Sequence, residues 1–261
     1  GTDAYIPGKS WDSEDNFRLV EGKEVGLIYG YVFEGLYGFN EFHRNGFSYA
    51  ANDEAYLAEN PGVQEKPTVT GLFGTAPGRI KLKDINGDGK IDSYDQVFLG
   101  KGGWYGSPFT LGVNLTAKWK NFTFFALGTG NFGAYGLKNN SYWWVKGDGK
   151  YSAVVRNRWT KATKETATYP RLTTLSGSNN YQTSDFWMYS TDRIDLQKVQ
   201  LSYDFPKAMF MKSFVRGLQL FVNGNSLLTI AKERKLMEMD VNNSGSAPLN
   251  RFYSIGAKVS F

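Results

Sequence analysis

The chain has 261 residues, is rich in glycine and aromatic residues, and contains no cysteine. The absence of cysteine excludes disulfides, and a single histidine, His43, makes a zinc site unfavourable. We assign no role to His43. The formal net charge is +5, but no run of four basic residues occurs, which argues against nucleic acid as a partner. Many aromatic residues and few helix formers favour an all-β fold.

The first patterned segment is the acidic stretch KLKDINGDGKIDSYDQV, residues 81–97. This stretch matches the ligand positions of an EF-hand calcium loop. Positions 1, 3, 5, 7, 9 and 12 correspond to Asp84, Asn86, Asp88, Lys90, Asp92 and Asp95. We expect Gly89 to permit the sharp turn, the Lys90 carbonyl to serve as a ligand, and Ile91 to anchor the loop.

Four carboxylates within twelve residues repel one another unless a cation neutralises them, so this acidic loop predicts a Ca²⁺ site. Aspartate at the last position reaches less far than the usual glutamate, which favours weak or magnesium-tolerant binding. The alternative is a polar loop that is rich in Asx turns and holds no metal.

Residues 107–132 predict a long β-hairpin with a two-residue turn at Lys120–Asn121. One face of the two arms carries Phe109, Leu111, Val113, Leu115, Ala117 and Trp119, followed by Phe122, Phe124, Ala126, Gly128, Gly130 and Phe132. The other face of the first arm is polar or small. Aromatic residues at both ends of long arms favour strands that face lipid, and the alternative is the core of a soluble β-sandwich.

A further aromatic cluster follows the hairpin. Its members are Tyr142, Trp143, Trp144, Tyr151 and Trp159. We expect these side chains to belong to loop packing or to an interfacial girdle; the alternative is that they stack on sugar rings or pack against a partner protein.

Three later segments repeat the alternation of apolar and polar residues. Their apolar positions are Val199, Leu201, Tyr203 and Phe205; Leu218, Leu220 and Val222; and Tyr253, Ile255, Ala257, Val259 and Phe261. Short connections at Lys120–Asn121 and 206–216 contrast with long ones at 133–190 and 229–249. In outer-membrane barrels the short turns face the periplasm, so we expect the long loops and the acidic loop to face outside.

Six segments in this order resemble the SusC/RagA-like TonB-dependent transporters of the Bacteroidetes outer membrane. They are LVEGKEVGLIYGYVFEGLY (19–37), the acidic loop with the strand pair behind it, YPRL (169–172), DRIDLQKVQLSYDFP (192–206), LQLFVNGNSLLT (218–229) and RFYSIGAKVSF (251–261). Members of that family are several times longer and carry an N-terminal plug and a barrel of about 22 strands. The chain also opens without an initiator Met or a signal peptide, and we interpret it as a piece of a longer protein.

The resemblance implies an all-β fold, in which residues 1–261 are the C-terminal part of a large antiparallel transmembrane β-barrel, with 192–261 as its last strands and the plug outside this chain. It implies energy-coupled import of oligosaccharides or oligopeptides across the outer membrane. The partners would be a SusD-like surface lipoprotein, the TonB complex, the remainder of the transporter and the lipid bilayer.

We find no nucleophile elbow, zinc signature or phosphate loop, so we do not expect an enzyme, and we assign no substrate-binding residues. The alternative function is a secreted, soluble, calcium-binding β-sandwich that acts as a carbohydrate-binding module.

Overall fold

The computed structural model of the chain describes residues 26–45, 48–50, 54–62, 66, 68–69, 75–102, 107–147, 152–174, 179–211, 214–233 and 250–261. These residues belong to two compact units. The loop unit is drawn from residues 1–101 and 137–188, and the sheet unit from 102–136 and 189–261. None of the helices in the described ranges has the length and hydrophobicity that crossing a membrane requires.

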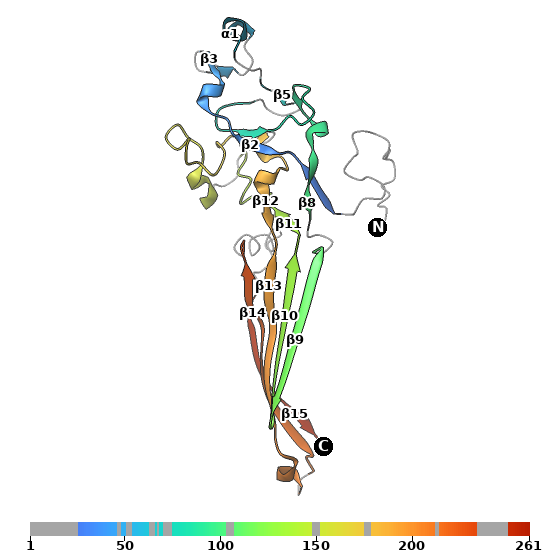
Figure 1. Cartoon of the computed structure of the whole chain (residues 1–261). Helices are drawn as coiled ribbons and strands as arrows, with labels where there is room; N and C mark the ends of the chain where they lie inside the picture. The colour runs from blue at the N-terminus through green and yellow to red at the C-terminus, as the bar shows by residue number, and fades with distance from the viewer. Residues whose placement is uncertain are drawn as a thin grey trace. The chain divides into compact units, whose positions relative to one another are not determined.

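The sheet unit is built around one five-stranded antiparallel sheet (Figure 1). Its strands are β9 (Phe109–Trp119), β10 (Phe122–Phe132), β13 (Arg193–Asp204), β14 (Gly217–Ala231) and β15 (Phe252–Ser260). They lie in the order β15-β14-β13-β10-β9. Each strand of this sheet therefore pairs with the next one along the chain, and β10 pairs with β13 although residues 137–188 of the loop unit lie between them in the sequence.

The predicted hairpin register is confirmed. Trp119 pairs with Phe122, and the ladder continues without a shift to Phe109 opposite Phe132. The turn has a φ of 52° at Lys120, a left-handed backbone conformation that a tight two-residue connection demands. Because side chains alternate along a strand, this register places the apolar residues of both arms on one face.

A β-bulge interrupts the ladders near the middle of β13. The register shifts between Leu196 and Lys198 on the β14 side, and between Leu127 and Gly128 of β10 on the other side. Ser226 in β14, opposite the bulge, has a φ of 53°. Bulges bend a strand and increase its twist, so alternation in β13 changes phase at this point.

The short connections lie at one end of the sheet, as predicted. Phe122, next to the β9–β10 turn, pairs with Tyr203, and Asp204 pairs with Gln219 just beyond the β13–β14 connection. That connection contains the 3-10 helix η8 (Lys207–Phe210).

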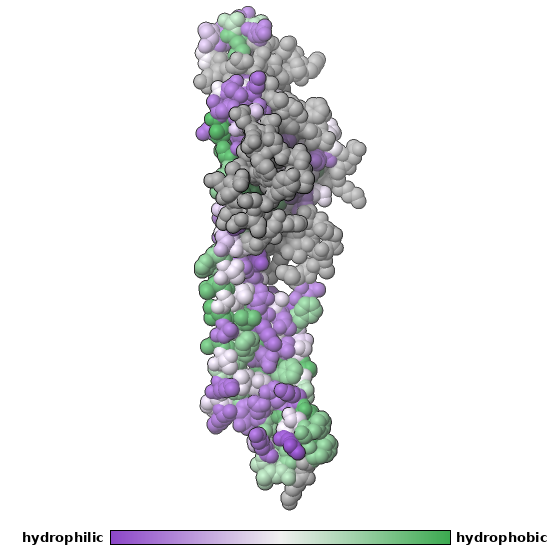
Figure 2. Space-filling model, turned by 90° about the vertical axis from the view of Figure 1, so that its right-hand side faces the viewer, coloured by the Kyte–Doolittle hydropathy of each residue, from purple (hydrophilic) through white to green (hydrophobic). Residues whose placement is uncertain are grey.

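One surface of the sheet, the apolar face, carries large exposed hydrophobic side chains. They include Phe109, Leu111, Val113, Leu115 and Trp119 of β9; Phe122 and Phe124 of β10; Ile194 and Leu201 of β13; Leu220, Val222, Leu228 and Ile230 of β14; and Tyr253, Ile255 and Val259 of β15. Figure 2, seen from the side on which β9 lies, shows hydrophobic residues along one side of the upper part of the sheet and hydrophilic residues beside them.

Exposure of the apolar face decides between the two folds considered from the sequence. Tyr253 is 73% exposed and Ile255 is 81% exposed, whereas a β-sandwich would bury both against a second sheet. The β-sandwich alternative is therefore wrong, and the strands fit part of a barrel wall that faces lipid.

The loop unit consists of short elements. Its strands pair as β1 (Leu27–Gly30) with β8 (Val97–Lys101), β2 (Phe33–Leu36) with β6 (Ile80–Leu82), β3 (His43–Asn45) with β4 (Ser48–Ala50), and β5 (Thr68–Val69) with β7 (Lys90–Ile91). Its described helices are α1 (Glu54–Glu59) and the 3-10 helices η2 (Phe39–Glu41), η3 (Ser93–Asp95), η5 (Ala153–Asn157), η6 (Asn179–Tyr181) and η7 (Asp185–Trp187). A further pair, β11 (Tyr135–Leu137) with β12 (Met188–Ser190), includes residues of both units.

The main hydrophobic core of the described residues lies in the loop unit. Its buried members are Tyr31, Ile80, Leu82, Ile91, Val145, Val155, Tyr169 and Trp187. Two buried asparagines complete the hydrogen bonding of Ile80: Asn180 Oδ1 accepts from its N–H at 2.9 Å, and Asn179 Nδ2 donates to its carbonyl at 2.6 Å. Side chains therefore replace a strand partner here, which keeps the buried backbone groups satisfied.

Candidate functional site

The surface of the sheet opposite the apolar face, here the polar face, presents mainly hydrogen-bonding side chains. These include Thr110, Asn114, Thr116 and Lys118 of β9; Thr123, Thr129 and Asn131 of β10; Arg193, Asp195, Lys198, Gln200 and Ser202 of β13; Gln219, Asn223, Asn225 and Thr229 of β14; and Ser254 and Lys258 of β15. The strands of an outer-membrane barrel likewise carry apolar side chains on the face toward lipid and polar side chains on the face toward water.

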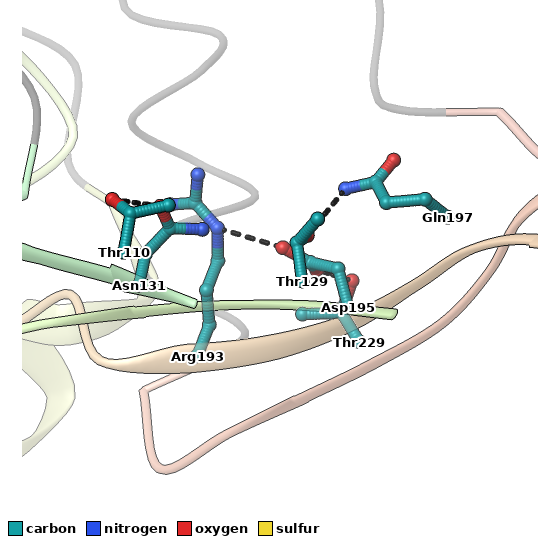
Figure 3. A network of polar contacts seen from close by, with 7 residues as sticks. All are labelled: Thr110, Thr129, Asn131, Arg193, Asp195, Gln197 and Thr229. Carbon is teal, nitrogen blue, oxygen red and sulfur yellow. Dashed lines mark hydrogen bonds and ion pairs between the residues drawn. The ribbon is translucent and has the colours of Figure 1, made fainter. Parts of the chain in front are cut away.

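A polar network lies at the end of the polar face away from the β9–β10 turn (Figure 3). It consists of Thr110, Thr129, Asn131, Arg193, Asp195, Gln197 and Thr229. The figure shows all seven side chains on the same side of the sheet. Cross-strand pairing puts them there, since Asn131 is opposite Arg193, Thr129 is opposite Asp195, and Asp195 is opposite Thr229.

Within this network Asp195 joins Arg193 and Thr229, while Thr110 binds Asn131 and Gln197 binds Thr129. The carboxylate of Asp195 accepts a hydrogen bond from Arg193 Nε at 2.9 Å and another from the Thr229 hydroxyl at 2.6 Å. The side chain of Asp195 is only 12% exposed, so these two donors replace much of its hydration. Hydrogen bonds to a charged acceptor are stronger than neutral ones, and they hold Arg193 against the sheet.

The alternation of apolar and polar residues predicts polar side chains on this face but does not predict the network. Asp195 and Thr229 are 34 residues apart, and their contact depends on strand pairing across the bulge. The alternation in DRIDLQKVQLSYDFP indicated a strand, but no local signal marked Asp195 as a shared acceptor.

The acidic loop is the second candidate site, and its side chains bind the backbone of the loop itself. The amides of Gly87 and Gly89 donate to Asp84, that of Asp88 to Asn86, that of Lys90 to Asp88, that of Tyr94 to Asp92, and those of Ile85 and Asp92 to Asp95, at 2.7–3.0 Å. Gly87 and Gly89 have φ values of 75° and 79°. The turn expected at Gly89 is confirmed, because this left-handed conformation favours glycine.

The loop is anchored at its second half. Ile91 is 1% exposed and belongs to the core of the loop unit, as the sequence predicted. Asp95 is fully buried and joins the two halves of the loop, since its Oδ1 accepts from Ile85 N and its Oδ2 from Asp92 N, both at 2.8 Å.

The donor atoms of the acidic loop have the chemistry that calcium and magnesium prefer: carboxylates, one amide oxygen and a backbone carbonyl. Among the described residues, no three His, Asp or Glu side chains converge closely enough to hold a metal ion. The carboxylates point instead to loop amides in the pattern of Asx turns. The residues fit a hard cation by ligand type, and binding would require some of these oxygens to turn toward a common point.

The aromatic cluster belongs to loop packing. Trp159 is 5% exposed, and Trp144 packs edge-on against Trp187 with ring centroids 6.2 Å apart. The Tyr169 hydroxyl donates to the Trp143 carbonyl at 2.7 Å, and burial raises the pKa of Tyr169. Tyr151 lies outside the described residues.

Comparisons with known proteins agree with this geometry. The chain matches no established family profile. It is 27% identical over 266 aligned positions to TonB-dependent receptor P26 of Formosa agariphila, covering 94% of this chain, and 23% identical over 212 positions to TonB-dependent receptor P3 of the same organism, covering 81%.

Solved structures of the RagAB peptide importer share the fold. The open-open state superposes with a TM-score of 0.57 at 16% identity over 91% of the chain, and a second RagAB structure, described as a peptide transporter, with 0.55 at 18% over 90%. The chain spans about a quarter or less of these proteins: 24% and 18% of the two receptors, and 24% and 23% of the two RagAB chains.

Proposed function

Because the chain is a segment of a SusC/RagA-like TonB-dependent receptor of the bacterial outer membrane, we propose that the complete receptor imports oligosaccharides or oligopeptides across that membrane. In this function the five strands of the sheet unit form part of the barrel wall. The apolar face contacts acyl chains, and the polar face lines the water-filled interior around the plug.

The observation that carries this proposal is the division of one sheet into two unlike surfaces. Val113 and Ile255 are 59% and 81% exposed on the apolar face. On the other face, Asp195 is held by Arg193 and Thr229. An exposed hydrophobic surface of this extent is unfavourable in water and favourable in lipid.

Two features of the whole receptor belong to the proposal. Energy for import comes from the TonB complex, which acts through the plug outside this chain; the names of the Formosa relatives support this coupling. A SusD-like surface lipoprotein covers the extracellular opening. The name RagAB peptide importer supports oligopeptides as one class of cargo. Oligosaccharides are the other class, which the resemblance of the sequence to the SusC/RagA-like family implies.

The relatives and neighbours are named as receptors and transporters, which agrees with a function other than catalysis. The experiment that tests import uses the full-length receptor in its native outer membrane. We expect extraction only with detergent, heat-modifiable gel mobility, and uptake of a fluorescent oligomer that stops when the proton gradient is dissipated. Uptake that continues unchanged in cells without TonB would contradict energy coupling.

Calcium binding by the acidic loop is a separate part of the proposal. Asp84, Asp88, Asp92 and Asp95, with Asn86 and the Lys90 carbonyl, would supply the oxygen ligands, and the bound ion would offset part of the repulsion among the four carboxylates. Because its last ligand is an aspartate, we expect millimolar affinity and competition by Mg²⁺.

Calorimetric titration of the metal-free full-length receptor with CaCl₂ tests this site. Asp84→Asn should abolish the binding heat. Asp204→Asn removes a carboxylate from the sheet unit and serves as the control that leaves the heat unchanged. The absence of binding at millimolar calcium would refute the metal site without affecting the import proposal.

A further inference from the structure

The loop unit contains a cavity of about 410 Å³ whose charged lining residues are all cations. We call it the cationic pocket; its lining residues are Phe39, Arg158, Trp159, Thr160, Lys161, Arg171 and Leu172. Its volume lies within the range of small-molecule sites, about 300–1,000 Å³. The sequence pattern predicts no role for these residues beyond the loop packing of Trp159.

Backbone pairing brings the cations of the pocket together. Arg158 forms a parallel bridge with Tyr169, and Trp159 N donates to the Tyr169 carbonyl at 2.8 Å, so residues 158–161 run beside 169–172. Arg171 is fixed through its own backbone, because its N–H donates to the Gly78 carbonyl at 2.7 Å and its carbonyl accepts from Asn180 Nδ2 at 2.9 Å.

Gly78 permits the close approach behind the pocket. Its φ is +80°, and a Cβ at this position would lie 2.4 Å from the Trp159 ring and 2.8 Å from the Arg171 Cβ. Only glycine fits such a conformation and such spacing without a shift of its neighbours. The ring of Phe39 also packs on Trp159, with centroids 4.8 Å apart.

The rim that carries Lys161 is a hydrogen-bonded turn. Thr160 N donates to the Thr163 hydroxyl at 3.0 Å, and that hydroxyl donates to the Arg158 carbonyl at 2.7 Å. Local hydrogen bonds of this kind hold a turn in one conformation, so the pocket is preformed on this side.

The positive charges of the pocket lack carboxylate partners. Within the part of the chain that the structure describes, no ion pair joins Arg158, Lys161 or Arg171 to an acidic residue. Glu41, close in sequence to Phe39, is bound by Lys81 at 3.1 Å and by Lys66 at 3.8 Å. Burial, and after it the charge of Arg171, lowers the pKa of Arg79, so a further positive charge lies near the pocket.

We propose that the cationic pocket binds an acidic sugar unit of the imported oligomer, with its carboxylate or sulfate held by Arg158 and Arg171. A guanidinium donates two parallel hydrogen bonds to such oxyanions. The sugar ring would cover the apolar edge formed by Phe39 and Leu172, a surface that the short side chain of an acidic peptide leaves uncovered. This proposal rests on the proposed import function and names its substrate class.

Calorimetry on the full-length receptor in detergent tests the proposal. The ligands are digalacturonate, a sulfated disaccharide, neutral cellobiose and the tripeptide of three glutamates. We expect one or both acidic disaccharides to bind and cellobiose to give no heat. Added salt should weaken binding, since it screens charges at an open site.

Arg171→Gln is the decisive variant, because Gln keeps both backbone hydrogen bonds at this position. Losing hydrogen bonds to a charged ligand should weaken binding at least about tenfold. Arg158→Gln should act in the same direction. The matched control is Arg156→Gln, since Arg156 is exposed on η5, two residues from Arg158, and does not line the pocket.

The other outcomes distinguish the pocket, the class of its ligand and the import function. Equal affinity in the receptor and in Arg171→Gln overturns the site. Binding of the glutamate tripeptide without either disaccharide overturns the sugar assignment and identifies an acidic peptide. If the receptor takes up neutral oligomers but does not bind acidic sugars, the pocket proposal is wrong and the import proposal is retained. If acidic sugars bind tightly to the pocket but no energy-dependent uptake occurs, the import proposal is wrong and the pocket proposal is retained.

Discussion

The sheet unit and the loop unit are stabilised by different kinds of contact. In the sheet unit, order comes from long ladders of backbone hydrogen bonds that join β9, β10, β13, β14 and β15, while large apolar side chains such as Ile255 stay exposed. In the loop unit the strands are two to five residues long, and order comes from a buried core around Trp187 and from side chains such as Asn180 that bind backbone groups.

This difference means that the two units depend on different surroundings. The loop unit carries its own hydrophobic core, whereas the sheet unit leaves its apolar surface for a lipid environment. Substitutions in the loop unit should therefore act on local folding, and substitutions on the apolar face should act on membrane assembly.

The largest effect is expected at Trp187. Its side chain is 2% exposed, packs against Tyr169 and Phe186, and donates to the Asn180 carbonyl at 2.8 Å. Trp187→Ala in the full-length receptor should destabilise the loop unit by about 3–5 kcal/mol. Hydrogen exchange should rise throughout residues 137–188 and stay unchanged in β9 and β10. The same change at the exposed Trp119 is the control, and equal effects of both variants would contradict the distinction between the units.

The apolar face is tested at Val113, in the middle of β9. Arginine facing lipid near the bilayer centre should cost about 2–4 kcal/mol, so Val113→Arg should reduce the amount of heat-modifiable receptor in the outer membrane. The adjacent Asn114 lies at the same depth on the polar face, and Asn114→Arg should assemble normally. If Asn114→Arg is the more damaging of the two, the assignment of the faces is reversed.

A smaller effect is expected in the polar network. Thr229→Val removes one of the two hydrogen bonds to Asp195 and should destabilise the sheet by about 1–2 kcal/mol. The measurement is the temperature at which the receptor loses its heat-modifiable mobility. Thr229→Ser keeps the hydroxyl and should retain most of the stability; a loss equal to that of valine would show that the hydroxyl contributes nothing.

The smallest effect concerns Tyr37 at high pH. Burial, followed by the charges of Glu41 and Glu34, raises the pKa of Tyr37 from 10.0 to about 12. Folding therefore favours the protonated phenol: this contribution is fully present below pH 10 and is lost as the pH rises toward 12, by about 1 kcal/mol at pH 11.

The absorbance of tyrosinate, compared between the receptor and Tyr37→Phe, measures this titration. The difference should have its midpoint near pH 12, and a midpoint near pH 10 would show that Tyr37 is accessible to water.

The sequence alone determined the features that depend on neighbouring residues. Alternation with a period of two assigned the faces of β9, β10 and β15, the turn at Lys120–Asn121 defined the hairpin register, and Gly89 marked a sharp turn. The six ordered segments indicated the receptor family, which the comparisons support.

Only the tertiary structure decided which distant residues meet. Asn180 binds the backbone of Ile80 across 100 positions of sequence, Thr229 pairs with Asp195 in a register that a bulge has shifted, and Arg158 and Arg171 line one pocket. No local period encodes these contacts, because a bulge or a loop changes the register between the partners. Strand faces follow from the geometry of a single strand, whereas binding sites follow from how separate segments pack.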